Sequence, residues 1–369
     1  MMHVVICGGG VIGAATAYFL SCRGVKATIV ERTGLACGAS GKAGGFLALD
    51  WCDGTPLQAL ARRSFALHGE LPQRIDGDWG YRRLSTYGGV AGLRNRVRQR
   101  GAGDAFGWLS AGVAVSQALG TLETTAQVHP ALFTAAMMRA AEAQGAELRI
   151  GRVTGLVTNG GQVEGVEVDG ATIACDAVVI AMGPWSILAA AWLQLPAVFG
   201  LKGHSLVFET GTRIPAEAAF LEYREANGAV QSPELFPRTD GTTYVCAISS
   251  ESPLPVDPAD VAPDKGALER LETMCRDISP VLGQAKILAR QACYRPVTRD
   301  GLPLIGLVAG MTGAYVATGH SVWGILNAPA TGEAIAELIT EGAARAIDLS
   351  PFDPARLPPL DPARLGRAT

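Results

Sequence analysis

The feature that most limits how this chain can fold is a glycine pattern near its start. Residues 4–6 are apolar, Gly8, Gly10 and Gly13 follow, and residues 14–20 are again mostly apolar. This order predicts the end of a buried strand, a glycine turn and an apolar helix. One glycine permits the tight turn, one lets the backbone approach a ligand, and one lets the helix pack against the strand. The free N–H groups at such a helix start suit a pyrophosphate, so we expect a dinucleotide site.

A carboxylate in the next strand supports this interpretation. Residues 25–32 are typical of a strand and contain Glu31, which lies roughly 20 residues after the glycines, as expected of a carboxylate that binds a ribose hydroxyl. Such a carboxylate would repel a 2′-phosphate, so NADP is disfavoured. The glycine pattern alone also occurs in plain structural turns, and the strand with Glu31 is what favours the dinucleotide.

Composition narrows the classes of partner. With 369 residues the chain is longer than a typical single domain, so we expect two domains. Its 31 basic and 34 acidic residues give no electrostatic argument for nucleic acid or an anionic membrane. The eight cysteines include no Cys-x-x-Cys pair, so no metal site is predicted. The first strand follows without a basic leader, and we expect a cytoplasmic protein with reduced thiols.

One uncharged stretch, residues 177–201, is long enough to span a bilayer. Gly183, Pro184 and Pro196 interrupt it, so we interpret it as a buried strand, a turn and a short apolar helix. No integral membrane segment is predicted.

The order of predicted elements indicates an α/β protein with discontinuous domains. Residues 152–183 alternate in strand fashion around a turn at residues 159–161, which predicts a small β-meander that leads back to the main sheet. Residues 200–290 favour a separate β-rich domain that binds substrate. The predicted assignment is residues 1–80, 128–200 and 291–350 for the dinucleotide-binding domain, residues 81–127 and 201–290 for the substrate domain, and residues 351–369 for a proline-rich C-terminal tail.

Four motifs in this order resemble the FAD-dependent oxidoreductases of the D-amino-acid oxidase, glycine oxidase and sarcosine oxidase type. They are CGGGVIGAATAYFL with the later Glu31, then GASGKAGGF, then AVVIAMGPWS, and finally RPVTRDGLPLIG together with ATGHSVWGILNAPATGEAIAEL. The resemblance covers nearly the whole chain. It implies an enzyme with FAD instead of NAD, built from a Rossmann-type, glutathione-reductase-like FAD-binding domain and a substrate domain of α+β type.

The resemblance also implies which residues hold FAD. The turn would bind the pyrophosphate and Glu31 the adenosine ribose, Val153 would face the adenine, and Gly183 would close on the cofactor. The expected FAD contacts are Gly8, Gly10, Val11, Ile12, Gly13, Glu31, Arg32, Ser40, Gly41, Lys42, Ala43, Gly44, Val153, Gly183, Trp185, Gly319, His320, Trp323, Gly324 and Ile325.

The stretch TGHSVWGILN has a physical interpretation of its own. A helix that begins just after Gly319 and His320 would direct a positive end, equivalent to roughly half an elementary charge, at whatever lies above it. A flavin that accepts a hydride becomes anionic around N1 and C2=O, so this helix end would stabilise the reduced cofactor. Gly324 would allow close approach of the ring. For His320 the plainer alternative is a turn histidine bonded to the backbone.

Arg295 is the expected substrate residue. The resemblance matches it to the arginine that pairs with the substrate carboxylate, and its planar fork suits two carboxylate oxygens. The structural alternative is an arginine that bridges the domains through Asp300 or another carboxylate. Four aromatic residues are candidate pocket walls or, alternatively, core: Trp51, Tyr223, Tyr244 and Trp323.

Cys293 and a missing lysine leave two questions open. Cys293 lies seven residues before Asp300, the offset at which sarcosine-oxidase relatives carry the cysteine that bonds covalently to FAD. Many other relatives hold FAD without a covalent bond, which we expect here, with a bond to Cys293 as the alternative. Those relatives also carry an oxygen-activating lysine on the strand that corresponds to residues 241–250, where this chain has none. Either oxygen or another electron acceptor could therefore reoxidise the reduced FAD.

The resemblance implies oxidation of an amino acid or an N-substituted amino acid. A hydride would pass from the α or N-alkyl carbon to flavin N5, and the resulting imine would hydrolyse. One alternative is a 2-hydroxy-acid dehydrogenase, for example for 2-hydroxyglutarate, in which His204 would be the candidate base. Another is a non-catalytic assembly factor that flavin stabilises. The sequence gives no indication of the oligomeric state.

Overall fold

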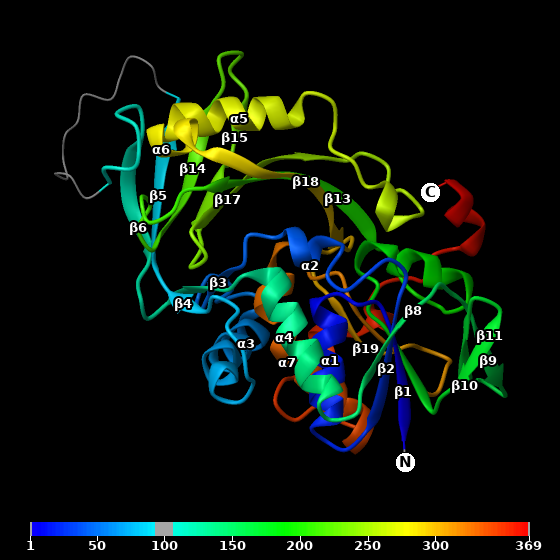
Figure 1. Cartoon of the computed structure of the whole chain (residues 1–369). Helices are drawn as coiled ribbons and strands as arrows, with labels where there is room; N and C mark the ends of the chain where they lie inside the picture. The colour runs from blue at the N-terminus through cyan, green and yellow to red at the C-terminus, as the bar shows by residue number, and fades with distance from the viewer. Residues whose placement is uncertain (1, 93–105, 368–369) are drawn as a thin grey trace.

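The computed structural model describes residues 2–92 and 106–367, and two sheets organise this part of the chain (Figure 1). Residues 93–105 of the predicted substrate domain lie outside the described residues, as do Met1 and residues 368–369. A six-stranded sheet has the order β19-β20-β12-β1-β2-β8, and its neighbours are parallel except for β19 and β20. Its strands are β1 (His3–Cys7), β2 (Lys26–Glu31), β8 (Glu147–Ile150), β12 (Ala177–Ile180), β19 (Leu304–Leu307) and β20 (Ala314–Thr318).

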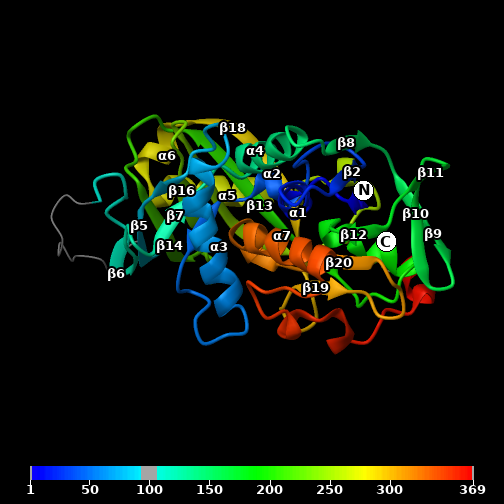
Figure 2. The same ribbon diagram turned by 90° about the horizontal axis from the view of Figure 1, so that it is seen from below.

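Two different layers cover the two faces of this sheet, and the central strands are therefore buried on both sides. Val4 and Ile6 of β1 belong to a core shared with the helices, whereas Val5 and Cys7 belong to a core shared with a small antiparallel sheet. Figure 2 shows α3 beside α7, and these two helices are in contact. The helices are α1 (Val11–Ser21), α3 (Gln58–Glu70), α4 (Pro130–Glu142) and α7 (Gly324–Glu341), and the small sheet contains β9 (Val153–Asn159), β10 (Gln162–Val168) and β11 (Ala171–Ala174).

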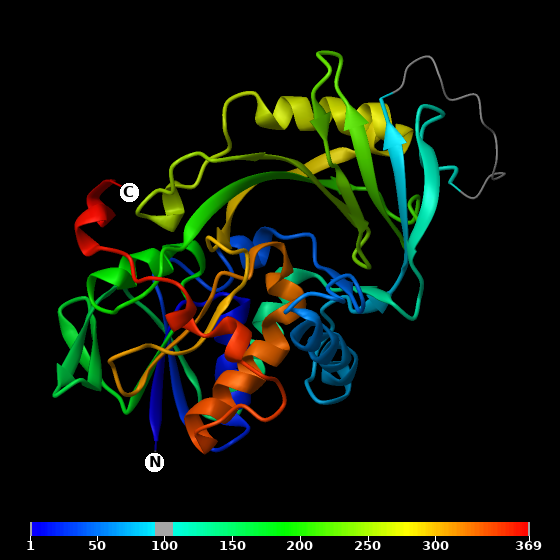
Figure 3. The ribbon, with the colours of Figure 1, turned by 180° about the vertical axis from the view of Figure 1, so that it is seen from behind.

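The large eight-stranded sheet forms the second domain. Its main path is β18-β13-β17-β16-β14-β5-β6, and β15 pairs with β14. Figure 3 shows α5 (Ala267–Ile278) along the face that points away from the first domain, with α6 (Pro280–Gln284) after it. The strands are β5 (Ser85–Ala91), β6 (Ala114–Gly120), β13 (Phe199–Glu209), β14 (Glu217–Arg224), β15 (Val230–Gln231), β16 (Glu234–Pro237), β17 (Thr242–Ser250) and β18 (Lys286–Val297).

Short elements join the two domains. A three-stranded sheet has the order β3-β7-β4, and a one-turn helix, α2, precedes it. Among the described residues, no helix is long and apolar enough to cross a membrane. The remaining elements are α2 (Ala39–Lys42), β3 (Phe46–Ala48), β4 (Arg82–Arg83), β7 (Thr125–Gln127) and the 3₁₀ helices η1 (Leu71–Gln73), η2 (Gly183–Ala191), η3 (Pro258–Asp260), η4 (Ser321–Trp323), η5 (Ser350–Phe352), η6 (Pro354–Arg356) and η7 (Pro362–Arg367).

The predicted fold class is confirmed, and two details of the organisation differ from expectation. The boundary predicted at residue 291 falls inside β18, which pairs with β13 along its length and so stays with the large sheet as far as Val297. The predicted tail packs on the first domain. The Arg356 guanidinium donates to both carboxylate oxygens of Asp300, at 2.8 and 3.1 Å, and the Leu360 N–H donates to the Leu195 carbonyl.

Candidate active site

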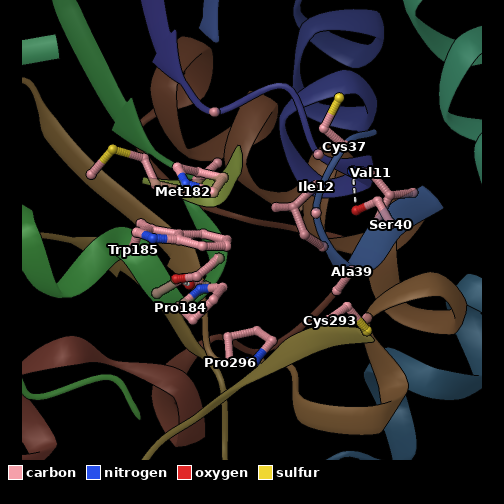
Figure 4. Close-up of a pocket in the computed structure, with 18 of the residues that line it drawn as sticks. Val11, Ile12, Cys37, Ala39, Ser40, Met182, Pro184, Trp185, Cys293 and Pro296 are labelled. Carbon is pink, nitrogen blue, oxygen red and sulfur yellow. Dashed lines mark hydrogen bonds between the residues drawn. The ribbon is translucent and has the colours of Figure 1, made fainter. Parts of the chain in front are cut away.

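A cavity of about 440 Å³ lies between the glycine turn of the first domain and strands of the large sheet. Figure 4 shows Val11 and Ser40 on one wall, with Trp185 and Met182 across from them and Cys293 on the side formed by β18. The predicted residues that line it are Gly8, Gly10, Val11, Ile12, Glu31, Arg32, Ser40, Ala43, Gly44, Val153, Gly183, Trp185, Cys293, Arg295, His320, Gly324 and Ile325. The fold therefore gathers residues from all four motifs around one cavity.

Five other residues predicted to contact FAD do not line the cavity: Gly13, Gly41, Lys42, Gly319 and Trp323. Several of them shape its walls instead. A side chain on Gly13 would clash with the Gly8 carbonyl oxygen, and one on Gly41 would clash with the Ala36 carbonyl oxygen. The Lys42 ammonium donates to the Ala292 carbonyl of β18 at 3.3 Å. Gly13 and Gly41 thus allow two backbone segments to lie close together, and Lys42 joins α2 to the large sheet.

The glycine turn has the geometry of an anion cradle. Gly8 has a φ of 114°, in the region that favours glycine, and a Cβ there would clash with the Ala181 carbonyl oxygen. Helix α1 is apolar on all sides, and every residue except Ile12 is buried, so packing against β1 and its neighbouring helices fixes the helix axis. No side chain caps the helix start at Gly10, although Ser40 Oγ accepts from the Val11 N–H at 2.9 Å. This turn fits a pyrophosphate.

Glu31 is held at the end of β2 by neighbouring backbone. Its Oε2 accepts from the Gly9 N–H at 2.7 Å, and its Oε1 accepts from the Thr33 N–H at 2.9 Å. Arg32 pairs with Asp257 at 2.8 Å and donates to the Val256 carbonyl, so a loop after β17 closes over this end of the cavity. The carboxylate therefore lines the cavity where a ribose that follows the pyrophosphate would lie.

The opposite end of the cavity is formed by η4 and the start of α7. Neither element has a side-chain cap, and Ser321 adopts a φ of 50°, which is unusual for a residue other than glycine. Uncapped N–H groups at a helix start carry partial positive charge. The structure thus agrees with a helix end directed at a group that becomes anionic, with the regular helix beginning at Gly324.

His320 is a buried, uncharged residue at this helix start. Its Nε2 lies 3.0 Å from the Thr331 hydroxyl oxygen, and no partner of Nδ1 is found within the described chain. Burial lowers the pKa of His320 to about 3, so the ring is neutral near pH 7. The plainer expectation of a turn histidine bonded to the backbone is not met, because the hydrogen-bond partner of the ring is the Thr331 side chain.

Arg295 reaches the cavity from β18. Its Nη1 donates to the Ser249 hydroxyl at 3.2 Å, and a Cβ on Gly203 would lie only 3.0 Å from its Nη2. A glycine at position 203 therefore leaves room for the guanidinium in this position. Asp300 pairs with Arg356, so the domain-bridging alternative through Asp300 does not apply to Arg295. None of the ion pairs of the described residues involves Arg295.

His204 is not a cavity residue, which corrects its candidacy as a catalytic base. It is fully buried, its Nδ1 donates to the Ile248 carbonyl at 3.0 Å, and its Nε2 accepts from the Asp264 N–H at 2.9 Å. Both ring nitrogens are thus used to hold the loop that carries Asp264. A histidine on this strand points away from the cavity because side chains alternate between the two faces of a sheet.

Trp51 also lies outside the cavity lining, in an aromatic cluster. Its Nε1 donates to the Leu119 carbonyl at 3.1 Å, its ring packs at 4.8 Å from that of Phe220, and Trp323 lies 6.3 Å away edge-on. Tyr223 donates to Asp277 in the core of the large sheet. Of the four aromatic candidates, Tyr244 alone lines the cavity.

Sequence reasoning missed Glu234 and Cys246, which line the cavity beside Tyr244 and Arg295. Glu234 is opposite Cys246 in the antiparallel register of β16 and β17, and the Cys246 thiol donates to Glu234 Oε2 at 3.6 Å. No local motif marks these residues. A charged residue in the otherwise apolar strand of residues 234–237 was the one available signal.

The sequence profile of a known family, FAD-dependent oxidoreductase, matches residues 3–338. The chain belongs to this family. The resemblance that four motifs indicated is thereby confirmed, as are the predictions of an oxidoreductase and of FAD as its cofactor. The glycine turn, Glu31 and the uncapped helix start are the features of this structure that fit the pyrophosphate, ribose and flavin ends of FAD.

Known relatives are similar along nearly the whole chain. A Schizosaccharomyces pombe protein described only as an oxidoreductase is 28% identical over 95% of this chain and 97% of its own. The glycine oxidase of Geobacillus kaustophilus is 28% identical over 96% of each chain. The crystal structure of glycine oxidase from G. kaustophilus aligns with a TM-score of 0.80 at 27% identity, covering 96% of this chain and 99% of that one. An L-proline dehydrogenase from P. horikoshii shares the fold, with a TM-score of 0.77 at 21% identity, covering 96% and 97%.

We expect acid precipitation of the purified holoprotein to release its flavin into the supernatant. Burial raises the pKa of the Cys293 thiol, although the Arg295 guanidinium and the Lys42 ammonium oppose this rise. A thiolate is the nucleophile that a covalent bond would require, so a protonated thiol disfavours it. Cys293→Ala should retain FAD. Flavin that stays with the native precipitate but leaves that of Cys293→Ala would instead establish a covalent link at Cys293.

Proposed function

We propose that this protein oxidises an amino acid or an N-substituted amino acid whose carboxylate binds Arg295. The observation that carries the proposal is a guanidinium in the cavity that forms no ion pair within 4.0 Å among the described residues, although the Glu234 carboxyl group lies near enough to influence its pKa. A guanidinium so placed is suited to bind a ligand carboxylate through two parallel hydrogen bonds. The G. kaustophilus relative named glycine oxidase supports the same class of substrate.

The residues of this chain bind and orient the substrate. Arg295 fixes the carboxylate, Ser249 holds the guanidinium by accepting from Nη1, and Gly203 leaves room for it. Tyr244 forms an apolar wall, since it is only 5% exposed and burial keeps its pKa well above the usual value. Bound FAD would supply an acceptor for the hydride that leaves the carbon next to the substrate nitrogen. The imine product then hydrolyses with water to a carbonyl compound and an amine.

The hydroxy-acid alternative loses the base expected for it, because His204 has both ring nitrogens engaged away from the cavity. A hydroxy acid must lose its hydroxyl proton to a base, whereas a neutral amine needs none. The non-catalytic alternative predicts no reduction by any small substrate. The product analysis described next distinguishes both alternatives from the proposed amino-acid oxidation.

Product analysis of the holoenzyme tests the proposal. The panel is glycine, sarcosine, D-alanine, L-proline and iminodiacetate, against glycolate and 2-hydroxyglutarate, each with oxygen and, separately, with an electron-accepting dye under argon. We expect at least one amine to yield a carbonyl acid and a stoichiometric amount of ammonium or amine. Turnover of the hydroxy acids alone would replace the proposal with the dehydrogenase alternative. No lysine is among the described residues that line the cavity, so the residues do not indicate which electron acceptor is used. Comparing turnover with oxygen and turnover with the dye identifies it.

A further inference from the structure

Glu234 places a carboxyl group in the cavity that holds Arg295. It is the first residue of β16, it lines the cavity, and its Oε2 accepts a hydrogen bond from the Cys246 thiol at 3.6 Å. No ion pair within 4.0 Å joins Glu234 to Arg295 or to any other described cation. The carboxyl group and the guanidinium therefore line the same cavity and influence each other's pKa without forming an ion pair within 4.0 Å.

The groups around Glu234 do not offer another partner for its charge. Tyr244 and Cys246 on β17 stay uncharged near neutral pH because burial raises the pKa of both well above the usual values. Cys293 on β18 is also a protonated thiol for the same reason. Burial raises the pKa of Glu234 itself, and the charge of Arg295 opposes part of that rise. A buried carboxylate without a direct cation is costly, so a ligand that supplies a cation is favoured here.

We propose that Glu234 binds the ammonium group of the substrate while Arg295 binds its carboxylate, and that Glu234 then accepts one proton from that ammonium. An N–H bond of the substrate breaks and an O–H bond on Glu234 forms. The ammonium becomes a neutral amine, the carboxylate becomes a carboxyl group, and no electron moves in this step. The inference rests on the proposed function and adds the residue that recognises the nitrogen.

The raised pKa of Glu234 agrees with this role in direction. A carboxyl group whose pKa lies nearer to neutrality is a better proton acceptor from an ammonium than one at its ordinary value. A neutral amine can release a hydride from the neighbouring carbon, whereas an ammonium has no free electron pair to form the imine. Glu234 would therefore allow the reaction at a pH where the free substrate is protonated.

Binding of ligands that have no hydrogen on the α carbon tests recognition without turnover. The probes are 2-aminoisobutyrate, 2-hydroxyisobutyrate and 2,2-dimethylpropanoate, which share a shape and differ by an ammonium, a hydroxyl and a methyl group. Each is titrated into the holoenzyme while the visible flavin spectrum is followed. We expect the native protein to bind 2-aminoisobutyrate about 10-fold or more tighter than 2,2-dimethylpropanoate. Glu234→Gln should lose this preference and bind 2,2-dimethylpropanoate more tightly than the native protein does.

Two further variants control for a general disturbance of the sheet. Glu222→Gln removes an exposed carboxylate of the neighbouring strand β14 and should keep the native preference. Glu234→Asp keeps the carboxyl group and should keep part of the preference for 2-aminoisobutyrate. All variants must hold FAD with a native visible spectrum. An unchanged preference in Glu234→Gln would overturn the inference and leave the proposed function intact. If no probe binds the native protein, or if 2-hydroxyisobutyrate is preferred, the proposed function fails as well.

The pH dependence of flavin reduction tests the proton transfer. With an amino acid found active in the product assay, Glu234→Gln should be slow near pH 7 and should speed up about tenfold per pH unit toward the pKa of the free substrate amine. A merely structural role would lower the rate equally at every pH. Parallel pH profiles of Glu234→Gln and the native protein would exclude proton transfer to Glu234.

Discussion

Replacing Arg295 with methionine should lower kcat/KM for the active amino acid by about 10² to 10⁴-fold while FAD stays bound. Methionine keeps much of the length and loses the charge and all five donors. Hydrogen bonds to charged groups contribute about 1.5–3 kcal/mol each, and two of them bind the carboxylate in the proposed complex. Arg295→Lys should recover only part of the loss because an ammonium cannot reproduce the planar fork.

Steady-state kinetics of Arg295→Met beside Arg290→Met check this result. Arg290 lies on the same strand but pairs with Glu272 of α5, on the face of the sheet away from the cavity, and half of its side chain is exposed. Its replacement should leave kcat/KM within about twofold of the native value, since surface pairs contribute little. An Arg295→Met protein with native turnover and native apparent affinity for every active substrate would show that the carboxylate does not bind there.

Replacing Gly13 with alanine should yield a protein that purifies largely without FAD. The added methyl group would overlap the Gly8 carbonyl oxygen, and because that atom is backbone, α1 has to move away from the glycine turn. Overpacking of this kind costs about 1–3 kcal/mol of stability. The same movement displaces the N–H groups that would bind the pyrophosphate, so we expect FAD affinity to fall about 10- to 100-fold.

Gly24→Ala is the matched control at the other end of α1. Gly24 has a φ of 71°, and a Cβ there would meet no atom within 4 Å. Its replacement should cost about 1–2 kcal/mol through the backbone conformation alone and leave FAD affinity unchanged. Titration of each apoprotein with FAD, followed by flavin fluorescence, and thermal unfolding separate the two effects. Equal FAD affinities in the two variants would refute the role assigned to the Gly8–Gly13 approach.

The cofactor half of the site could be predicted from the sequence because local spacing determines it. The turn from Gly8 to Gly13 joins one strand to the helix that follows it, and Glu31 ends the next strand, so few residues separate the groups that meet. The same holds for His320 and Gly324, which flank one helix start. Each of these positions has a backbone reason that is visible in the residue types.

In the proposed substrate half, the resemblance predicted Arg295 but no local spacing predicted Glu234, because pairing between distant strands brings these residues together. Glu234 reaches the cavity through the register of β16 with β17, and Arg295 comes from β18, two strands beyond β17. A shift of one residue in such a register would turn each side chain to the other face, which is also why His204 could not be excluded from sequence. The cytoplasmic location and the reduction of oxygen stay predictions.

Anaerobic mixing of the holoprotein with the amino acids of the panel tests the central claim most directly. Oxidation of an amino acid bound by Arg295 predicts that the visible absorbance of the flavin is lost with at least one amino acid, and that Arg295→Met shows no such loss at the same concentration. A native protein that holds FAD and keeps its full absorbance with every amino acid, while a 2-hydroxy acid bleaches it, would contradict the claim.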